Sequence, residues 1–314
     1  LLNQTYEYYY NSNLNVIKLN AKVKMKDREK AFVDYDHIII TNKLLLNCLD
    51  YIKGPYALLV DEVHHYFGDC FSDALKVQLS DCPVRIGLTG TMPQDKLKRE
   101  KILCHLGGEE IDTLKSKDLI SNKQASTVDI TLWQTYHPEM AEASRASEWE
   151  WETEREYITT NTKRLEAIAD FIKSLPPKNT LVLCHAAAGK KLCEYFDNRI
   201  IVDETPTEER EELIGSFDDK EDAIVFGSIG TVSTGLSQNR IFRVIMIDFT
   251  KSKANAMQSI GRGIRLDGDI NHLEVIDISA DTKFAKIHQK ERIRIYKEEG
   301  YPYKKADESI VVPE

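Results

Sequence analysis

Two adjacent carboxylates stand where an apolar run ends, and this placement suits metal binding and water activation. The run Leu58–Val60 is followed at once by Asp61 and Glu62. If the run is a strand of a parallel sheet, both side chains lie at the carboxyl edge, where open α/β folds bind ligands. One carboxylate can hold Mg²⁺ and the next can deprotonate an attacking water. A helix cap would use the same residue types, so the pair alone does not decide.

A second strand-end motif contains small hydroxyl residues. Thr89, Gly90 and Thr91 follow the apolar run that begins at Val84. Glycine and short side chains let the backbone approach a phosphate or a neighbouring loop closely. A plain turn, with Pro93 opening the next helix, is the alternative interpretation.

A third motif places two arginines on one side of a helix end. Arg262 and Arg265 are three residues apart, and Gln258 precedes them. Guanidinium groups meet phosphate oxygens in pairs of hydrogen bonds. An arginine delivered from one domain to a phosphate held by another neutralises developing charge in phosphoryl transfer. The alternative is a solvated basic turn paired with nearby aspartates.

A hydroxyl-rich stretch follows another apolar run. It extends over residues 228–237 and contains Ser233, Thr234 and Gly235. Such a stretch is either a flexible loop or a contact to a sugar-phosphate backbone.

The elements that position these motifs are apolar runs alternating with helical patterns. This alternation predicts two parallel α/β units. Because the runs are continuously apolar, the strands are expected to be buried on both faces. The expected strands are residues 15–19, 37–41, 56–61 and 84–89, then 180–184, 199–202, 223–227, 243–248 and 274–278. The expected helices are residues 43–51, 72–79 and 94–106, then 162–174, 189–196, 207–217 and 252–261. The boundary is expected between residues 135 and 160.

Composition fits a folded two-domain protein of a reducing compartment. The chain has 314 residues, 42% of them hydrophobic and 30% charged, with six scattered cysteines and a net charge of -9. A membrane protein, a secreted precursor and a disordered chain are therefore not expected. The acidic charge is concentrated in residues 203–222, whereas residues 283–299 predict a basic stripe through Lys286, Lys290, Arg294 and Lys297. A salt-bridged exterior is the alternative for that helix.

The order of these motifs resembles that of the superfamily 2 helicases and translocases. Asp61-Glu62-Val63-His64, then Thr89-Gly90-Thr91, then residues 230–237, then Gln258 to Arg265 correspond to motifs II, III, V and VI. Thr41-Asn42 takes the place of motif Ib, and residues 182–185 take that of motif IV. Residues 230–237, 251–253 and 258–262 more narrowly resemble the UvsW-type phage helicases, which remodel branched DNA.

The resemblance implies roles for individual residues. Asp61 would hold Mg²⁺ and Glu62 would activate water, so the implied cofactors are ATP and Mg²⁺. His64, Thr89, Gly90 and Thr91 would couple the nucleotide site to the strand-binding face. Gln258, Arg262 and Arg265 would complete the site from the second domain, and Gly235 would approach the nucleotide sugar. The residues expected to contact phosphates of one nucleic-acid strand are Thr41, Asn42, His185, Ser233 and Thr234.

One family motif has no counterpart in this sequence. No loop of the form G-x-x-x-x-G-K-[ST] is present, and the nearest similar stretch, Gly189-Lys190-Lys191, lacks the hydroxyl residue. We therefore expect the chain to be a fragment of a longer protein, inactive without its upstream phosphate loop. The resemblance implies RecA-like domains at residues 1–135 (incomplete) and 161–280, a linker at 136–160 and a helical extension at 281–314.

The predicted function is an ATP-dependent DNA helicase or translocase that unwinds or branch-migrates branched DNA in recombination, repair or fork processing. Its expected partners are branched DNA and single-strand junctions, with RNA in hybrids as a further partner. We expect a cytoplasmic monomer, in the bacterial host if phage-encoded. Two alternatives stay open: an RNA helicase or motor subunit of a restriction or repair complex, and a non-catalytic nucleic-acid-binding module.

Overall fold

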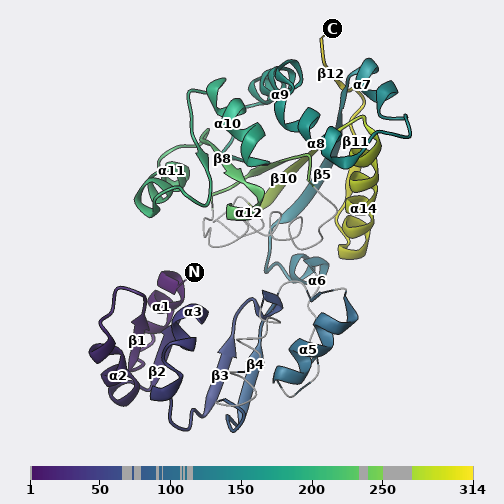
Figure 1. Cartoon of the computed structure of the whole chain (residues 1–314). Coiled ribbons are helices and arrows are strands. Elements are labelled where there is room, and N and C mark those ends of the chain that lie inside the picture. Colours follow the sequence, from purple (N-terminus) through teal and green to yellow (C-terminus); the bar gives the residue numbers. More distant parts are fainter. Residues whose placement is uncertain are drawn as a thin grey trace. The chain divides into compact units, whose positions relative to one another are not determined.

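The structure is a computed structural model that divides into two units (Figure 1). It describes residues 2–65, 73, 79–89, 92–93, 95–106, 108, 110–111, 116–232, 240–249 and 271–313. The first unit is Leu1–Thr113 and the second is Leu114–Glu314. Each unit is built around parallel strands, which confirms the predicted α/β class.

The first unit contains two separate pairs of parallel strands. β1 (Val16–Leu19) pairs with β2 (His37–Ile40), and β3 (Ala57–Val60) pairs with β4 (Val84–Gly87). All four match strands predicted from apolar runs. The helices described in this unit are α1 (Leu2–Tyr10), α2 (Met25–Asp34), α3 (Asn42–Leu46) and α5 (Lys96–Leu106), with 3-10 turns at Leu49–Tyr51 and Val63–His65.

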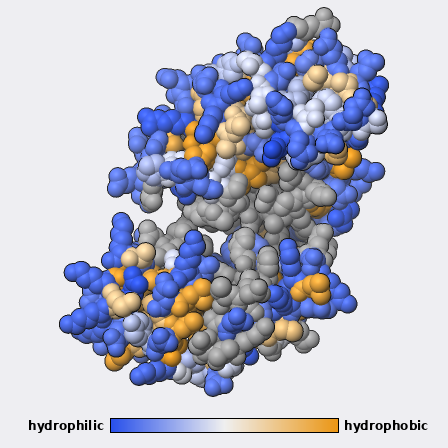
Figure 2. Space-filling view, in the orientation of Figure 1, coloured by the Kyte–Doolittle hydropathy of each residue, from blue (hydrophilic) through white to orange (hydrophobic). Residues whose placement is uncertain are grey.

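The strands of the first unit are not buried on both faces, which corrects the expectation from the sequence. Val60 packs with Leu45, Leu79 and other residues of a small core. Its neighbour Leu59 is 56% exposed, and Ile86, directly opposite on β4, is also exposed. Apolar residues accordingly reach the surface of this unit (Figure 2). A continuously apolar run is thus compatible with a strand covered on one side only.

The second unit is formed by one eight-stranded parallel sheet. Its strand order is β11-β5-β10-β9-β6-β8-β7, and β12 also pairs with β5. The strands are β5 (Thr127–Tyr136), β6 (Thr180–Cys184), β7 (Ile200–Ile201), β8 (Ile224–Ser228), β9 (Arg243–Ile247), β10 (His272–Ala280), β11 (Tyr303–Lys305) and β12 (Ile310–Val311). Because every pairing is parallel, the carboxyl ends of these strands share one edge.

Helices cover both faces of this sheet. Leu181 and Leu183 pack on one face with Phe217 of α11 and Tyr296 of α14. Val182 and Cys184 pack on the other with residues of α9 and α10. The helices are α6 (Ser116–Ser121), α7 (Pro138–Ala143), α8 (Trp151–Thr160), α9 (Thr162–Ser174), α10 (Ala186–Glu194), α11 (Thr207–Asp219), α12 (Ile229–Val232) and α14 (Lys283–Glu299). The predicted helix at residues 162–174 is confirmed in full.

The stretch expected to be a linker lies inside the second unit. Trp149 Nε1 donates to Glu154 Oε2 over 2.8 Å, and the same carboxylate accepts from the Phe284 and Ala285 amides at the start of α14. The fully buried Glu154 thereby caps α14 through Phe284, which lies 130 residues later, since an acidic group is favoured at a helix N-terminus. The structure divides the chain before β5, ahead of the expected boundary.

A buried ion pair fastens α14 to the sheet. The side chains of Arg292 and Asp277 are both 0% exposed and share two hydrogen bonds of 2.6 and 2.9 Å. Burial alone would lower the pKa of Arg292, but the facing Asp277 carboxylate raises it. Burial, together with Asp277, raises the pKa of Tyr296, whose hydroxyl therefore stays protonated and donates to Asp277 over 2.9 Å. Arg292 also donates to the Phe249 carbonyl.

Removing the guanidinium should be costly. Arg292→Met leaves the Asp277 charge buried and unpaired, so the free energy of unfolding should fall by about 3–5 kcal/mol in a denaturant titration. The control is Arg294→Met on the same helix, where an exposed arginine pairs with Glu291 and Glu298 and should contribute less than about 1 kcal/mol. Equal losses for the two variants would contradict this account.

Candidate functional site

The two acidic residues lie where β3 ends, as predicted. Leu88 N donates to Val60 O over 2.8 Å and Val63 N donates to Leu88 O over 3.0 Å, so the end of β4 fixes the turn. Within the turn, Asp61 Oδ1 accepts from Glu62 N over 2.9 Å. Glu62 has a φ of +50°, a left-handed conformation that a residue with a side chain adopts at some cost. The Asp61 side chain is left exposed to solvent.

The structure joins this acidic turn to the second predicted motif. His64 Nδ1 lies 2.7 Å from Thr89 Oγ1 and 3.3 Å from Glu62 Oε2. His64 is 8% exposed, so these contacts form away from bulk water. The ring thus links the ends of β3 and β4. This arrangement brings together three of the residues predicted for catalysis and coupling.

Thr41 and Asn42 stand at the carboxyl end of the other strand pair. Thr41 precedes α3 with an extended backbone, and Asn42 Oδ1 accepts from Lys43 N over 2.8 Å. Both side chains are exposed. They therefore follow β2, as expected from the sequence, and β2 pairs with β1.

In the second unit, His185 and the start of α12 follow paired residues at the same sheet edge. Cys184 pairs with Ser228, so the residues after β6 and β8 leave the sheet together. His185 precedes α10, and its Nε2 is buried without a hydrogen-bond partner among the residues that the structure describes.

Asp203, to which the sequence analysis assigned no role, contacts the start of the hydroxyl-rich stretch. Thr231 Oγ1 donates to Asp203 Oδ1 over 2.6 Å and lies 2.7 Å from Ser228 Oγ. Residues 229–232 form the short helix α12 rather than a loop. Asp203 follows β7 at the same sheet edge. Its position after a predicted strand is the feature of the sequence that could have indicated its role.

Buried contacts also hold Asp248, the residue that follows β9. Arg164 contacts Asp248 over 2.8 Å and donates to Thr135 Oγ1 and to the Ile158 carbonyl. Both ionic partners are buried. Asp248 has a φ of +52°, so the backbone turns sharply where the chain leaves the sheet. The sequence analysis did not assign a role to either residue.

The remaining predicted site residues lie outside the described part of the structure. They are Gly90, Thr91, Ser233, Thr234, Gly235, Gln258, Arg262 and Arg265.

The donor set around Asp61 fits a magnesium ion held jointly with a nucleotide. An exposed carboxylate supplies the oxygen ligand that Mg²⁺ prefers, and this ion commonly takes only one or two carboxylates and completes its shell with phosphates and water. The described residues contain no group of three His, Cys, Asp or Glu side chains that could hold a metal alone.

Among the helices in the described part of the chain, none combines the length and the apolar character that a membrane span requires.

Comparison with known proteins agrees with the motif pattern. Residues 163–267 match the family described as "Helicase conserved C-terminal domain". Over 273 residues, the chain is 25% identical to the ATP-dependent DNA helicase uvsW of Enterobacteria phage T4, covering 78% of this chain and 53% of that protein. The chain is therefore similar in sequence to helicases over part of its length. It spans about half the length of the curated helicase that it matches.

Solved helicase structures share the fold. The DUF1998 helicase MrfA, bound to DNA and AMPPNP, gives a TM-score of 0.61 at 14% identity, over 97% of this chain and 44% of that one. The Mycobacterium smegmatis helicase Lhr, bound to ssDNA and AMP-PNP, gives 0.55 at 16% identity, over 93% and 39%. The matched helicase family segment contains the Asp203–Thr231 and Arg164–Asp248 contacts.

The Thr231 hydroxyl should be needed for the stability of this edge. Thr231→Val removes the hydrogen bonds to Asp203 and Ser228, and we expect a loss of about 1 kcal/mol in urea unfolding. Thr231→Ser keeps the hydroxyl and should recover most of that loss. A serine variant as unstable as the valine variant would contradict this account, because restoring the hydroxyl would not have restored the stability.

Proposed function

We propose that this chain forms the motor of an ATP-dependent DNA helicase or translocase that acts on branched DNA. The observation that carries the proposal is the 2.7 Å contact between His64 and Thr89, which links the acidic strand end to the second motif. Support also comes from the relatives: uvsW is an ATP-dependent DNA helicase, and MrfA and Lhr were solved with DNA and a nucleotide analogue.

In this proposal the first unit supplies the acidic half of the nucleotide site. Asp61 is a ligand for Mg²⁺, which when bound neutralises charge on the phosphates of ATP. Glu62 takes a proton from the attacking water. His64 and Thr89, with Gly90 and Thr91, pass the change at Glu62 to the strand-binding face.

The second unit supplies the positive charge. Gln258, Arg262 and Arg265 complete the site, and Gly235 approaches the nucleotide sugar. Guanidinium groups suit this task because they neutralise phosphate oxygens as the bond breaks. The phosphates of one strand are contacted by Thr41, Asn42, His185, Ser233 and Thr234. Contacts of this kind position a strand without reading its sequence.

Branched DNA is the first choice of substrate because the chain resembles a phage DNA helicase. The protein would then work as a monomer in the cytoplasm of a bacterial host. An RNA helicase, or a motor subunit of a restriction or repair complex, is the second candidate, since phosphate contacts serve both nucleic acids. A non-catalytic binding module is disfavoured because binding a phosphate backbone requires neither Glu62 nor the paired arginines.

The substrate is tested by strand displacement with the protein expressed from its natural gene. A labelled four-way DNA junction, a DNA fork and an RNA duplex of the same sequence are each incubated with ATP and Mg²⁺. The proposal predicts faster conversion of the branched DNAs. Faster displacement of the RNA would favour the second candidate, and no displacement with retained binding would favour the binding module.

Glu62→Gln should abolish ATP hydrolysis and leave nucleotide binding intact, because the amide keeps the shape of the side chain but cannot accept a proton. Single-turnover hydrolysis and binding of a labelled nucleotide are measured on the protein expressed from its natural gene. Glu100→Gln, on the exposed face of α5, is the matched control. Unchanged turnover in Glu62→Gln would refute the assigned role.

Arg265→Ala should cut turnover steeply with little loss of DNA affinity, because the guanidinium acts on the transition state and not on the bound strand. Steady-state hydrolysis and DNA binding are measured together. Arg240→Ala, which removes an arginine beside Glu221, serves as the control. A parallel loss of turnover and affinity would point to a nucleic-acid contact instead.

A further inference from the structure

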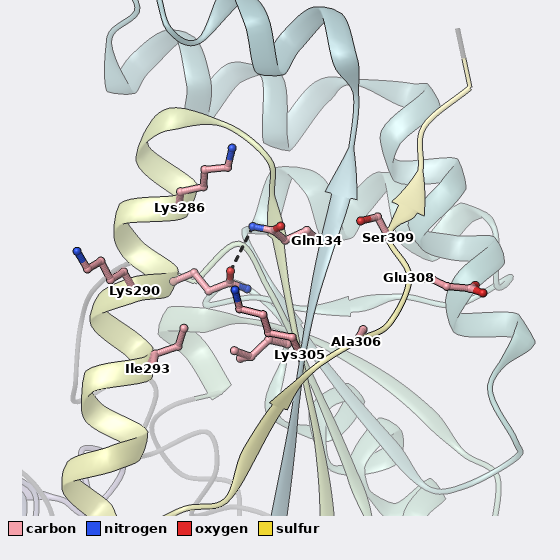
Figure 3. A pocket seen from close by; sticks show the side chains of 10 residues that line it. Gln134, Lys286, Lys290, Ile293, Lys305, Ala306, Glu308 and Ser309 are labelled. Carbon is pink, nitrogen blue, oxygen red and sulfur yellow. Dashed lines mark hydrogen bonds between the residues drawn. The ribbon is translucent and has the colours of Figure 1, made fainter.

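A cavity of about 300 Å³ in the second unit lies outside all the residues assigned above. It opens between β5, α14 and the segment after β11 (Figure 3). Its lining includes Lys286, Lys290 and Lys305 and the amides of Gln134 and Gln289, although the Lys290 ammonium points away from Gln134 and Lys305 in Figure 3. In Figure 3 the Lys305 side chain extends toward α14, whereas Glu308, the one carboxylate of the lining, points away from that helix.

The lysines around the cavity differ from the arginines of α14 in what they contact. The sequence left open whether this helix carries a basic stripe or a salt-bridged exterior. Arg292 forms a buried ion pair with Asp277, and Arg294 pairs with Glu291 and Glu298. Lys290 and Lys305, in contrast, have neither an ion pair nor a side-chain hydrogen bond among the described residues, whereas Lys286 forms an ion pair with Asp281. Positive charge therefore remains available at the cavity.

The amides of the wall have donor capacity to spare. Gln134 Nε2 donates to Gln289 Oε1 and Gln289 Nε2 donates to the Trp133 carbonyl, both over 3.5 Å. This separation is at the outer limit of an N–H···O hydrogen bond, and each amide nitrogen carries two hydrogens. Gln289 is only 7% exposed, so a ligand oxygen in the cavity would meet a donor that water reaches poorly. Ammonium and amide donors together select an anion with several oxygens.

The position of the cavity favours a nucleic-acid phosphate as that anion. Gln134 pairs with Ser279 near the carboxyl ends of β5 and β10, at the sheet edge that also carries His185. Strands β10 and β9 separate β5 from β6, so the cavity and His185 are about 14 Å apart across the edge, at ~4.8 Å per strand. A few nucleotides span this distance, so one strand can contact both places.

We propose that this cavity binds a backbone phosphate of the DNA strand, with Lys305 beside the phosphate and the amides of Gln134 and Gln289 as further donors from the wall. The proposal rests on the proposed function, since it extends the path of the same strand. It adds to that path a contact provided by the C-terminal helix and by β11.

The adjacent lysine on β11 provides a matched control. Neighbouring side chains on a strand point to opposite faces, so Lys304→Gln removes the same charge as Lys305→Gln outside the cavity. Affinity for a fluorescent single-stranded DNA is measured by anisotropy across a salt series with the protein expressed from its natural gene. Lys305→Gln should weaken binding several-fold and lower the slope of log K against log salt by about 0.7, the value for one lost phosphate contact. Lys304→Gln should bind like the unmodified chain, and thermal unfolding verifies that both variants fold.

Each other result contradicts a distinct statement. Equal effects of the two substitutions overturn the cavity site while the unmodified chain still binds DNA. No binding by the unmodified chain contradicts the proposed function, and the cavity site with it. AMP is the second probe: if AMP binds in a Lys305-dependent manner while Lys305→Gln leaves DNA affinity unchanged, the phosphate belongs to a free nucleotide and the strand contact is overturned.

Discussion

The buried pair of Arg292 and Asp277 is the interaction on which the second unit most depends. It lies where α14 crosses β10, and Arg292 also holds the Phe249 carbonyl at the end of β9. A second pair, Arg164 with Asp248, holds the adjacent backbone from α9, on the opposite face of the sheet. Charges buried in this way are tolerated only when every partner is in place. The two pairs together determine how the chain leaves β9, just before the residues that carry Gln258, Arg262 and Arg265.

The two units differ in how their strands are covered. In the second unit every residue of β6 and β9 is buried, because helices pack on both faces of the eight-stranded sheet. In the first unit β3 and β4 keep Leu59 and Ile86 in solvent. The acidic turn is nonetheless defined, since its backbone hydrogen bonds and the His64 contacts are local to the ends of those two strands. A short, local set of contacts therefore suffices to place Glu62 against His64.

Most elements could be predicted because their signals are local. The α9 helix has an Asn161 cap that accepts from Arg164 N and an apolar face of Leu165, Ile168 and Ile172, so its limits could be read from the sequence. β5 was not predicted, because its residues alternate between buried and exposed, whereas the prediction of strands relied on continuously apolar runs. The capping role of Glu154 could not be predicted, because it depends on the start of α14 far along the chain.

The site residues likewise divide into those with a local signal in the sequence and those without one. Asp61, Glu62, His64 and Thr89 were found because they follow apolar runs in a recognisable order. Asp203 was not found, because an aspartate in an acidic run resembles any solvated carboxylate until Thr231 is placed beside it. Residues that come into contact only because their strands are neighbours in the sheet have no characteristic spacing in the sequence.

The most direct test of the central claim is ATP hydrolysis by the protein expressed from its natural gene, measured with and without branched DNA. The account predicts a basal rate that rises when the DNA is added, because strand binding and the nucleotide site are coupled through the His64–Thr89 contact. No hydrolysis in either condition, with DNA binding retained, would contradict the account and identify the chain as a binding module.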